Sequence, residues 1–333
     1  MKNILITGGA GFIGLNLAVQ FLNKEYNVVV VDDLKNSYKK HINKLLKQFN
    51  NLTFYKGDVC DYNFMENVFK LHSFDTIIYL SAKKYIFESF KHKRLYMKNN
   101  MESLDVVLKL ASIFKIKKFM FASSVTVYGN NESKNIKEIE SYAPISPYAL
   151  TKVMGEEKIM EWHKQNKDAG VIIFRFTNPC GANIRYMLGD NAKSKKLSLV
   201  AYIVNNALNN VPLKFNGNNH NTFDGTPVRD YIHIVDLANI VFNVLNNVKD
   251  GKLEILNVGG GGNGYSVLQI LSAVEKVLEC KIDYCFIDKK QGDVARLVCD
   301  NTKLKSTYNI YPTLNICDIV KDEIEFRKYI NKK

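Results

Sequence analysis

Several features are scarce or missing in this chain of 333 residues, and each absence excludes a class of protein. No stretch reaches the roughly 18 consecutive apolar residues that a membrane-spanning helix needs. Proline occurs only 6 times and glycine 19 times, which excludes collagen and disordered repeats of low complexity. The short apolar run at the N-terminus stops at glycines, where a signal peptide would continue. We therefore expect a folded cytoplasmic protein with no membrane partner.

Cysteine is also sparse, and its spacing predicts neither a metal site nor a redox motif. The 6 cysteines contain no CxxC pair and no histidine at zinc-ligand spacing. We interpret them as free thiols in a reducing compartment, and we expect no metal. They are Cys60, Cys180, Cys280, Cys285, Cys299 and Cys317.

Acidic residues are outnumbered, since 46 lysines and arginines against 33 aspartates and glutamates give a net charge of +13. Such a surplus suits nucleic acid, an anionic membrane or a phosphorylated small molecule. The basic patches at 38–47, 115–118 and 193–196 are scattered and alternate with asparagine, as solvated surfaces do. We therefore predict no nucleic-acid partner and leave most of the surplus unassigned.

Short apolar runs alternate with longer amphipathic segments through the first half of the chain. The runs are rich in β-branched and aromatic residues, which is typical of buried parallel strands. This rhythm predicts an α/β protein with a Rossmann-like, doubly wound parallel sheet. The predicted strands are 4–7, 28–31, 52–55, 76–80, 118–123 and 171–176, and the clearest helices are 12–23 and 95–115.

The rhythm breaks near residue 178, where short runs and glycine-rich turns replace it. Two helices are predicted beyond this point, over 197–208 and 265–278, and the glycines at 259–262 are interpreted as the turn into the second. We expect a nucleotide-binding domain over 1–177 and a smaller α/β domain over 178–333. The stretch around 231–256 is expected to return to the first domain.

A glycine loop follows the first predicted strand and leads into a helix. Gly8, Gly11 and Gly14 allow a tight turn and close backbone approach to a pyrophosphate, which the helix N-terminus stabilises. Asp32 ends the second strand 18 positions after Gly14, near the spacing at which a carboxylate binds adenosine ribose hydroxyls. A carboxylate there repels a 2′-phosphate, so the pattern favours NAD over NADP. The residues assigned to the loop contact are Gly8, Gly11, Phe12, Ile13 and Gly14.

The segment SPYALTK predicts a catalytic helix. Ser146 is a good N-cap and Pro147 is favoured at the first helical position, so Tyr148 and Lys152 should lie one turn apart on one face. A nearby ammonium and a positive nicotinamide ring both stabilise a phenolate, which makes the tyrosine a candidate base. The Ser/Thr cluster at 123–129 follows the fifth strand and supplies further hydroxyls.

Five segments together resemble a known family. They are TGGAGFIG at 7–14, FASSVTVYG at 121–129, SPYALTK at 146–152, RFTNPCG at 175–181 and DGTPVRDYIHIVDLA at 224–238. In order and spacing they are similar to the extended short-chain dehydrogenase/reductases, and within these most to the UDP-glucose (UDP-galactose) 4-epimerases. The resemblance runs from the first strand to about residue 305.

The resemblance implies a NAD-dependent isomerase of galactose and nucleotide-sugar metabolism that moves a hydride from carbon 4 of a UDP-sugar and returns it to the opposite face. Tyr148 would be the base, Lys152 would hold the nicotinamide ribose and lower the tyrosine pKa, and Ser124 would bind the same sugar hydroxyl. NAD would stay bound and be regenerated in each cycle. The further NAD contacts implied are Asn36, Ser37, Asp58, Val59, Lys84 and Asn99.

The smaller domain would hold the UDP-sugar. Lys290 stands where the family usually has arginine, so the bidentate fork is lost, with Arg296 a candidate to compensate. Ser198 replaces an asparagine, and Leu297 stands at the position that gates the sugar 2-substituent. Acceptance of N-acetyl sugars is therefore open. The substrate residues implied are Ser124, Tyr148, Asn178, Ser198, Arg229, Lys290, Asp293 and Leu297, with the loop 290–293 around them.

Several alternatives remain at this stage. Dehydratases of the family need a carboxylate pair where Val125 and Thr126 stand, so dehydration is disfavoured. A UDP-glucuronate 4-epimerase, or another nucleotide-sugar-modifying member, is the nearest enzymatic rival. A non-catalytic NAD-sensing protein is disfavoured because Tyr148 and Lys152 are both present. The resemblance also implies a homodimer, although the apolar stripe within 97–111 would equally suit packing on the sheet.

Overall fold

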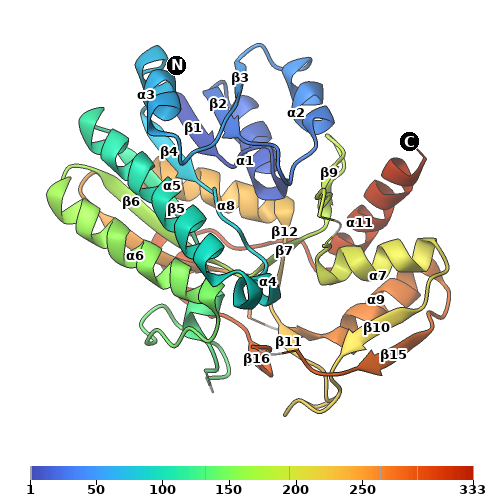
Figure 1. Cartoon of the computed structure of the whole chain (residues 1–333). Helices are drawn as coiled ribbons and strands as arrows, with labels where there is room; N and C mark the ends of the chain where they lie inside the picture. Colours follow the sequence, from blue (N-terminus) through green and yellow to red (C-terminus); the bar gives the residue numbers. More distant parts are fainter. Residues whose placement is uncertain (1, 132, 195, 263, 291, 333) are drawn as a thin grey trace.

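Seven parallel strands form the central sheet, in the order β13-β6-β5-β4-β1-β2-β3 (Figure 1). The computed structural model describes residues 2–131, 133–194, 196–262, 264–290 and 292–332. The six strands predicted from the first half are confirmed, and one further strand, β13, joins them at the edge beside β6. Their bounds are β1 (Asn3–Thr7), β2 (Asn27–Asp32), β3 (Leu52–Lys56), β4 (Thr76–Tyr79), β5 (Lys118–Ser124), β6 (Gly170–Phe176) and β13 (Leu253–Val258).

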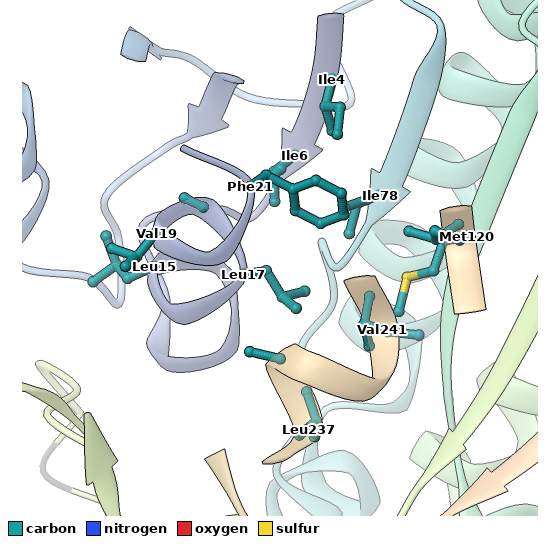
Figure 2. Packing of buried hydrophobic residues seen from close by; sticks show 14 of the residues in the cluster. Ile4, Ile6, Leu15, Leu17, Val19, Phe21, Ile78, Met120, Leu237 and Val241 are labelled. Atoms are coloured by element: carbon teal, nitrogen blue, oxygen red, sulfur yellow. The ribbon is translucent and has the colours of Figure 1, made fainter. Parts of the chain in front are cut away.

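Both faces of the sheet are covered by helices, because successive side chains of each strand point to opposite faces. On one face Ile4 and Ile6 of β1 pack against α1 and α8, and Figure 2 shows Phe21 of α1 beside Ile78 of β4, with Val241 of α8 nearby. On the other face the strands pack against α3, α5 and α6. The helices are α1 (Phe12–Leu22), α3 (Tyr62–Leu71), α5 (Lys93–Ile113), α6 (Pro147–Gln165) and α8 (Ile234–Asn247).

The strand order reverses between β1 and β4, and ligands of doubly wound sheets bind at such a switch point. The loops leaving the two strands meet there: a Cβ added to Gly8 would lie 3.1 Å from the Cα atom of Ser81. Smaller elements flank this region. They are α2 (Lys39–Leu46), α4 (Ile86–Lys91) and the 3-10 helix η1 (Val125–Tyr128).

The C-terminal part gathers beside the carboxyl edge of the sheet, at the lower right of Figure 1. The helices α7, α9 and α11 enclose a hydrophobic cluster with β10, and β15 pairs with β10. The bounds here are β8 (Ala182–Asn183), β9 (Leu188–Gly189), α7 (Leu199–Leu208), β10 (Leu213–Asn216), α9 (Val267–Leu278), β15 (Tyr284–Ile287), α10 (Thr302–Tyr308) and α11 (Ile316–Asn331).

Two further small sheets pair segments within the C-terminal part of the chain. In one, β7 (Asn178–Cys180) pairs with β12 (Tyr231–His233). In the other, β11 (Val228–Arg229) lies between β14 (Tyr265–Ser266) and β16 (Arg296–Leu297). Within the described parts of the chain, no helix is both long and apolar enough to cross a membrane.

The predicted helix over 265–278 starts two residues too early. Tyr265 and Ser266 pair with β11, and the helix begins at Val267, where the Ser266 side chain accepts from Gln269 in a capping box. The glycines before it serve close packing, because a Cβ on Gly259 would lie 2.0 Å from a carboxyl oxygen of Asp230. A strand pairing with a segment far back in the chain therefore takes the first two residues of the expected helix.

Candidate active site

The glycine loop connects β1 to α1 in the conformation that the spacing predicts. Gly8 has φ +66°, which favours glycine, and a Cβ on Gly14 would lie 2.5 Å from the Cα atom of Gly9. Gly11 caps α1, whose first turn has neither a side-chain cap nor an acidic residue. A helix N-terminus of this kind suits the diphosphate of a dinucleotide, with Phe12 and Ile13 in its first turn.

Asp32 lies at the end of β2 and holds the loop in place. Its carboxylate accepts from the backbone N–H of Ala10 at 3.1 Å and from that of Leu34 at 2.8 Å. Burial raises the pKa of Asp32, while these hydrogen bonds and one with Ser37 act in the opposite direction. The carboxylate thus stands beside the helix N-terminus, where it can accept from ribose hydroxyls.

The residues assigned to the adenosine side follow the second and third strands. Ser37 and Val59 are buried, whereas Asp58 remains partly exposed. The backbone N–H of Cys60, more than any other group, lowers the pKa of Asp58. Sequence reasoning missed Lys35, whose ammonium lies 2.9 Å from Asp33 and 3.0 Å from Asp58 and so links the two segments.

A distant basic segment also contacts this end of the site. Lys193 donates from its backbone to the carbonyl of Asn36 at 2.9 Å and from its ammonium to that of Leu34 at 2.7 Å. The Ser194 hydroxyl lies 2.7 Å from that of Tyr85, on the opposite side of the switch point. Lys193, Ser194 and Lys196 of the predicted solvated patch 193–196 are exposed, and Lys193 and Ser194 also contact the loops that follow β2 and β4; Lys195 lies outside the described residues.

The loop after β4 carries the exposed Lys84, whose ammonium lies 5.8 Å from the centre of the Tyr85 ring. Asn99 on α5 is half-buried. Its buried neighbour Asn100, which sequence reasoning missed, accepts from the Lys83 backbone at 2.8 Å and donates to the Thr151 hydroxyl at 3.0 Å. This amide therefore ties the loop to the catalytic helix.

Helix α6 begins as predicted, with Pro147 at its start and the Ser146 side chain accepting from the Ala149 N–H at 3.1 Å. Tyr148 and Lys152 are 9% and 5% exposed, so both are buried in this structure. The ammonium lies 5.9 Å from the centre of the tyrosine ring. Base and cation are thus one turn apart at the carboxyl edge of the sheet.

Burial dominates the electrostatics of this pair. It raises the pKa of Tyr148 to about 12, against a hydrogen bond with Ser124 that lowers it. It lowers the pKa of Lys152 to about 8, and only Glu156 opposes this. The Lys152 ammonium donates to the carbonyl of Ala122 at 2.6 Å, which fixes its position beside the end of β5. The phenol is therefore protonated at neutral pH until further positive charge lies against it.

A buried polar network supports the catalytic helix from behind, and sequence reasoning missed it. Glu156 is fully buried and receives three hydrogen bonds from Arg175 of β6, at 2.7 Å, 3.0 Å and 3.2 Å. Ser123 donates to the same carboxylate, as does Tyr142 at 2.8 Å. Because each member lies on a different element, only the folded chain brings the network together.

Among the substrate residues implied by the resemblance, Arg229 lies on β11, and Asp293 and Asn178 contact Arg229 and the residue after it. Arg229 forms an ion pair with Asp293, while the Asn178 amide donates to the carbonyl of Asp230 at 2.8 Å. Ser198 caps α7, and its hydroxyl is buried without a hydrogen-bond partner among the described residues.

The other implied substrate residues, together with Arg296, lie further apart. The Lys290 ammonium lies 4.7 Å from the centre of the Phe87 ring, and Arg296 donates to the carbonyl of Lys134 at 2.9 Å. Leu297 is buried in a hydrophobic cluster with residues of η1 and α6. Gln291, within the predicted loop 290–293, lies outside the described residues.

These residues fit a dinucleotide, since an uncapped helix N-terminus, a buried carboxylate and a Tyr–Lys pair line the same edge of the sheet. Across the described part of the chain, no three His, Cys, Asp or Glu residues are grouped as metal ligands. The model of the NAD dependent epimerase/dehydratase family matches residues 4–259. The chain belongs to this family.

Curated relatives and solved structures place the chain more closely within this family. It is 34% identical to the UDP-glucose 4-epimerase of Bacillus subtilis over 305 residues, covering 91% of this chain and 90% of the relative. It is 35% identical to that of Drosophila melanogaster over 313 residues, covering 90% and 89%. A crystal structure of the Bifidobacterium longum UDP-glucose 4-epimerase in complex with NAD+ and UDP superposes with a TM-score of 0.94 at 31% identity, over 98% of both chains.

Proposed function

We propose that this member of the NAD-dependent family catalyses the 4-epimerisation of a UDP-hexose, interconverting UDP-glucose and UDP-galactose. The observation that carries the proposal is the placement of Tyr148 and Lys152, one turn apart, at the same sheet edge as the glycine loop. The relatives that share nearly the whole length of the chain are named for this activity.

When bound, NAD supplies the acceptor and later the donor for the hydride of sugar carbon 4. Tyr148 takes the proton of the 4-hydroxyl and afterwards returns it, and Ser124 holds that hydroxyl through its side chain. Lys152, fixed by the carbonyl of Ala122, adds positive charge beside the phenol and holds the nicotinamide ribose. The 4-keto sugar would turn over in the pocket, so the hydride would return to the opposite face of carbon 4 while the proton returns to the oxygen, and the configuration would invert without net oxidation.

Tyr148 needs help to act as a base, since burial raises its pKa to about 12 even though the hydrogen bond with Ser124 lowers it. The Lys152 ammonium lies 5.9 Å from the centre of its ring and supplies positive charge there. The base would therefore become active only in the loaded site, where bound NAD would add the positive charge of its nicotinamide ring. This arrangement suits an enzyme whose cofactor stays bound throughout the cycle.

We also propose a division of labour between the two parts of the chain. Residues 1–177, with the returning segment that includes α8 and β13, would hold NAD, and the rest of 178–333 would hold the UDP-sugar. Arg229, paired with Asp293, offers the diphosphate a charge-assisted hydrogen bond. Asn178 and Ser198 stand nearby at the start of β7 and of α7.

The enzyme is further proposed to be a cytoplasmic homodimer. The stripe on α5 considered above is used within the chain, because Leu104 and Ala111 are fully buried. Leu95 and Ile113 of α5 and Leu150 of α6 are 45%, 54% and 43% exposed, and they offer the apolar surface that remains on these helices. Light scattering of the purified protein distinguishes one copy from two.

The decisive experiment is incubation of the purified protein with NAD and, separately, UDP-glucose, UDP-N-acetylglucosamine and UDP-glucuronate, with the products identified by NMR. We expect UDP-galactose from UDP-glucose. Turnover of UDP-glucuronate alone would instead identify the uronate epimerase, and no epimer from any sugar would favour the NAD-sensing protein. Tyr148→Phe serves as the matched inactive control.

A further inference from the structure

His220 lies in the loop between β10 and β11, behind the ion pair assigned to the UDP diphosphate. Its side chain is fully buried, and neither ring nitrogen has a hydrogen-bond partner among the described residues. A buried polar group without a hydrogen-bond partner destabilises the fold, because it has lost its hydrogen bonds to water. We therefore expect the imidazole to form a hydrogen bond in another state of the protein, such as the substrate complex.

The loop is built closely around this ring. Gly217 has φ +71°, and a Cβ there would lie 3.2 Å from Nε2 of His220. Gly225 has φ +75°, a Cβ there would lie 2.1 Å from the carbonyl oxygen of Asn218, and the His220 backbone donates to the Gly225 carbonyl at 2.9 Å. Two left-handed glycines thus hold the histidine in one place.

Three charged groups face the ring from the elements packed around it. Nε2 lies 4.0 Å from a carboxyl oxygen of Asp293, whose other oxygen binds Arg229 of β11. Lys289 also lies close by, since a Cβ on Gly217 would lie 3.2 Å from its Cβ atom as well as from Nε2 of His220. Burial lowers the pKa of His220, Lys289 and Arg229 lower it further, and Asp293 alone raises it.

We propose that His220 is a positioning residue for the UDP-sugar: it takes up a proton as the diphosphate binds, and then donates to Asp293, which holds Arg229 toward the diphosphate. The proposal deepens the proposed function and rests on it. Asp293 lies between His220 and Arg229, so protonation of His220 acts on Arg229 through this carboxylate. His220 itself need not touch the substrate.

The direction of the pH dependence follows from charge. In the free protein the imidazole is neutral near pH 7, because burial and two cations disfavour its charged form. A diphosphate beside Arg229 brings negative charge and raises the pKa of His220, so binding takes up a proton. By linkage, affinity then falls as pH rises, by at most about tenfold per pH unit for one proton. We expect the KM of the wild type to rise about five- to tenfold between pH 6 and pH 8, with kcat changing less than about twofold.

The test compares the KM and kcat of the NAD-loaded enzyme for UDP-glucose from pH 5.5 to 8.5, in the wild type and three variants. UDP-glucose is the probe because a terminal phosphate, as in UDP, titrates near pH 6 itself. His220→Gln keeps a donor that cannot titrate, and His220→Phe removes it. His163→Gln is the matched control, since Nε2 of His163 is also buried without a partner among the described residues, yet lies on α6.

We expect His220→Gln to lose most of the rise in KM, His220→Phe to have a KM about five- to tenfold above the wild type at pH 6, and His163→Gln to follow the wild type. A His220→Gln variant that keeps the wild-type rise would overturn the proposal, and it does so even if the phenylalanine variant does not fold. An effect on kcat with KM unchanged would also overturn it.

Failure of the proposed function is distinguished separately, because the wild type would then produce no UDP-galactose from UDP-glucose. Calorimetry of UDP-glucose binding at pH 6.5, in two buffers of different ionisation enthalpy, measures proton uptake without turnover. Uptake that disappears in His220→Gln supports the inference. Equal uptake in both proteins, or no binding at all, refutes it.

Discussion

Replacing Lys152 with methionine should stabilise the NAD-free protein at neutral pH, although it removes a residue of the proposed catalytic pair. The ammonium is 5% exposed, and burial lowers its pKa from 10.5 to about 8. The folded state therefore pays for charge at this position in every solution below about pH 8. Methionine has nearly the same length and carries no charge.

The magnitude follows from the pKa difference. At 1.36 kcal/mol per unit, the difference between 10.5 and 8 is worth about 3 kcal/mol against the charged side chain. The pKa difference compares the charged side chain with its neutral amine. Methionine additionally loses the hydrogen bond of that amine to the Ala122 carbonyl, which costs about 1 kcal/mol. The net gain is about 2 kcal/mol. At about 0.7 kcal/mol per degree for a chain of 333 residues, Tm rises by about 3 °C.

The sign of the pH dependence makes the prediction sharper. Between pH 8 and pH 10.5 the unfolded Lys152 binds more protons than the folded one, so the stability of the wild type rises with pH. The advantage of Lys152→Met should shrink above pH 8 and reverse near pH 10, where only the lost hydrogen bond remains.

The assay is thermal unfolding followed by circular dichroism at pH 7, 9 and 10, on protein freed of NAD. Lys158→Met is the control, since Lys158 lies on the same helix but is only half-buried and is paired with Asp105; its stability relative to the wild type should not change with pH. A Lys152→Met variant that is less stable at pH 7, or whose difference from the wild type is the same at pH 7 and pH 10, would refute the reasoning.

Three further predictions concern the site and its support. Tyr148→Phe should lower turnover at least about a hundredfold while NAD stays bound, and near-normal turnover would remove the phenol from the mechanism. Leu297→Ala should raise kcat/KM for UDP-N-acetylglucosamine relative to UDP-glucose, and an unchanged ratio contradicts its gating role. Because the leucine is buried, the free energy of unfolding should also fall by about 2–4 kcal/mol. Arg175→Met removes the ion-pair partner of the buried Glu156. The free energy of unfolding should therefore fall by about 3–5 kcal/mol, and Tm by about 4–7 °C. Arg185 is exposed, so the control variant Arg185→Met should change Tm by less than about 1 °C. An equal loss of Tm in the two variants would contradict the role of the buried ion pair.

The sheet could be predicted because its strands carry their own signal. A run such as 28–31 is apolar on both faces, as a strand between two helical layers must be, and it pairs with both β1 and β3 in the structure. The two-residue strands carry no such pattern. Tyr265 joins a strand only because Arg229, far back in the chain, lies opposite it.

The same distinction applies to the site. The start of α6 and the spacing of Tyr148 and Lys152 are local, so the sequence alone predicts them. Asn100 and His220 act through partners that only the tertiary fold brings near, and neither stands in a recognisable motif. Their types are also ordinary for loops and helix surfaces, so composition offers no signal.

The position of β13 late in the sequence affects how the chain folds during synthesis. The sheet that holds the glycine loop lacks its edge strand until residue 258 has been synthesised, long after the loop itself. Until then β6 has a free edge, and the apolar face that α8 later covers is open to other chains. A fragment ending at residue 177 should therefore aggregate instead of folding into a nucleotide-binding unit, and the nascent chain depends on protection over that interval.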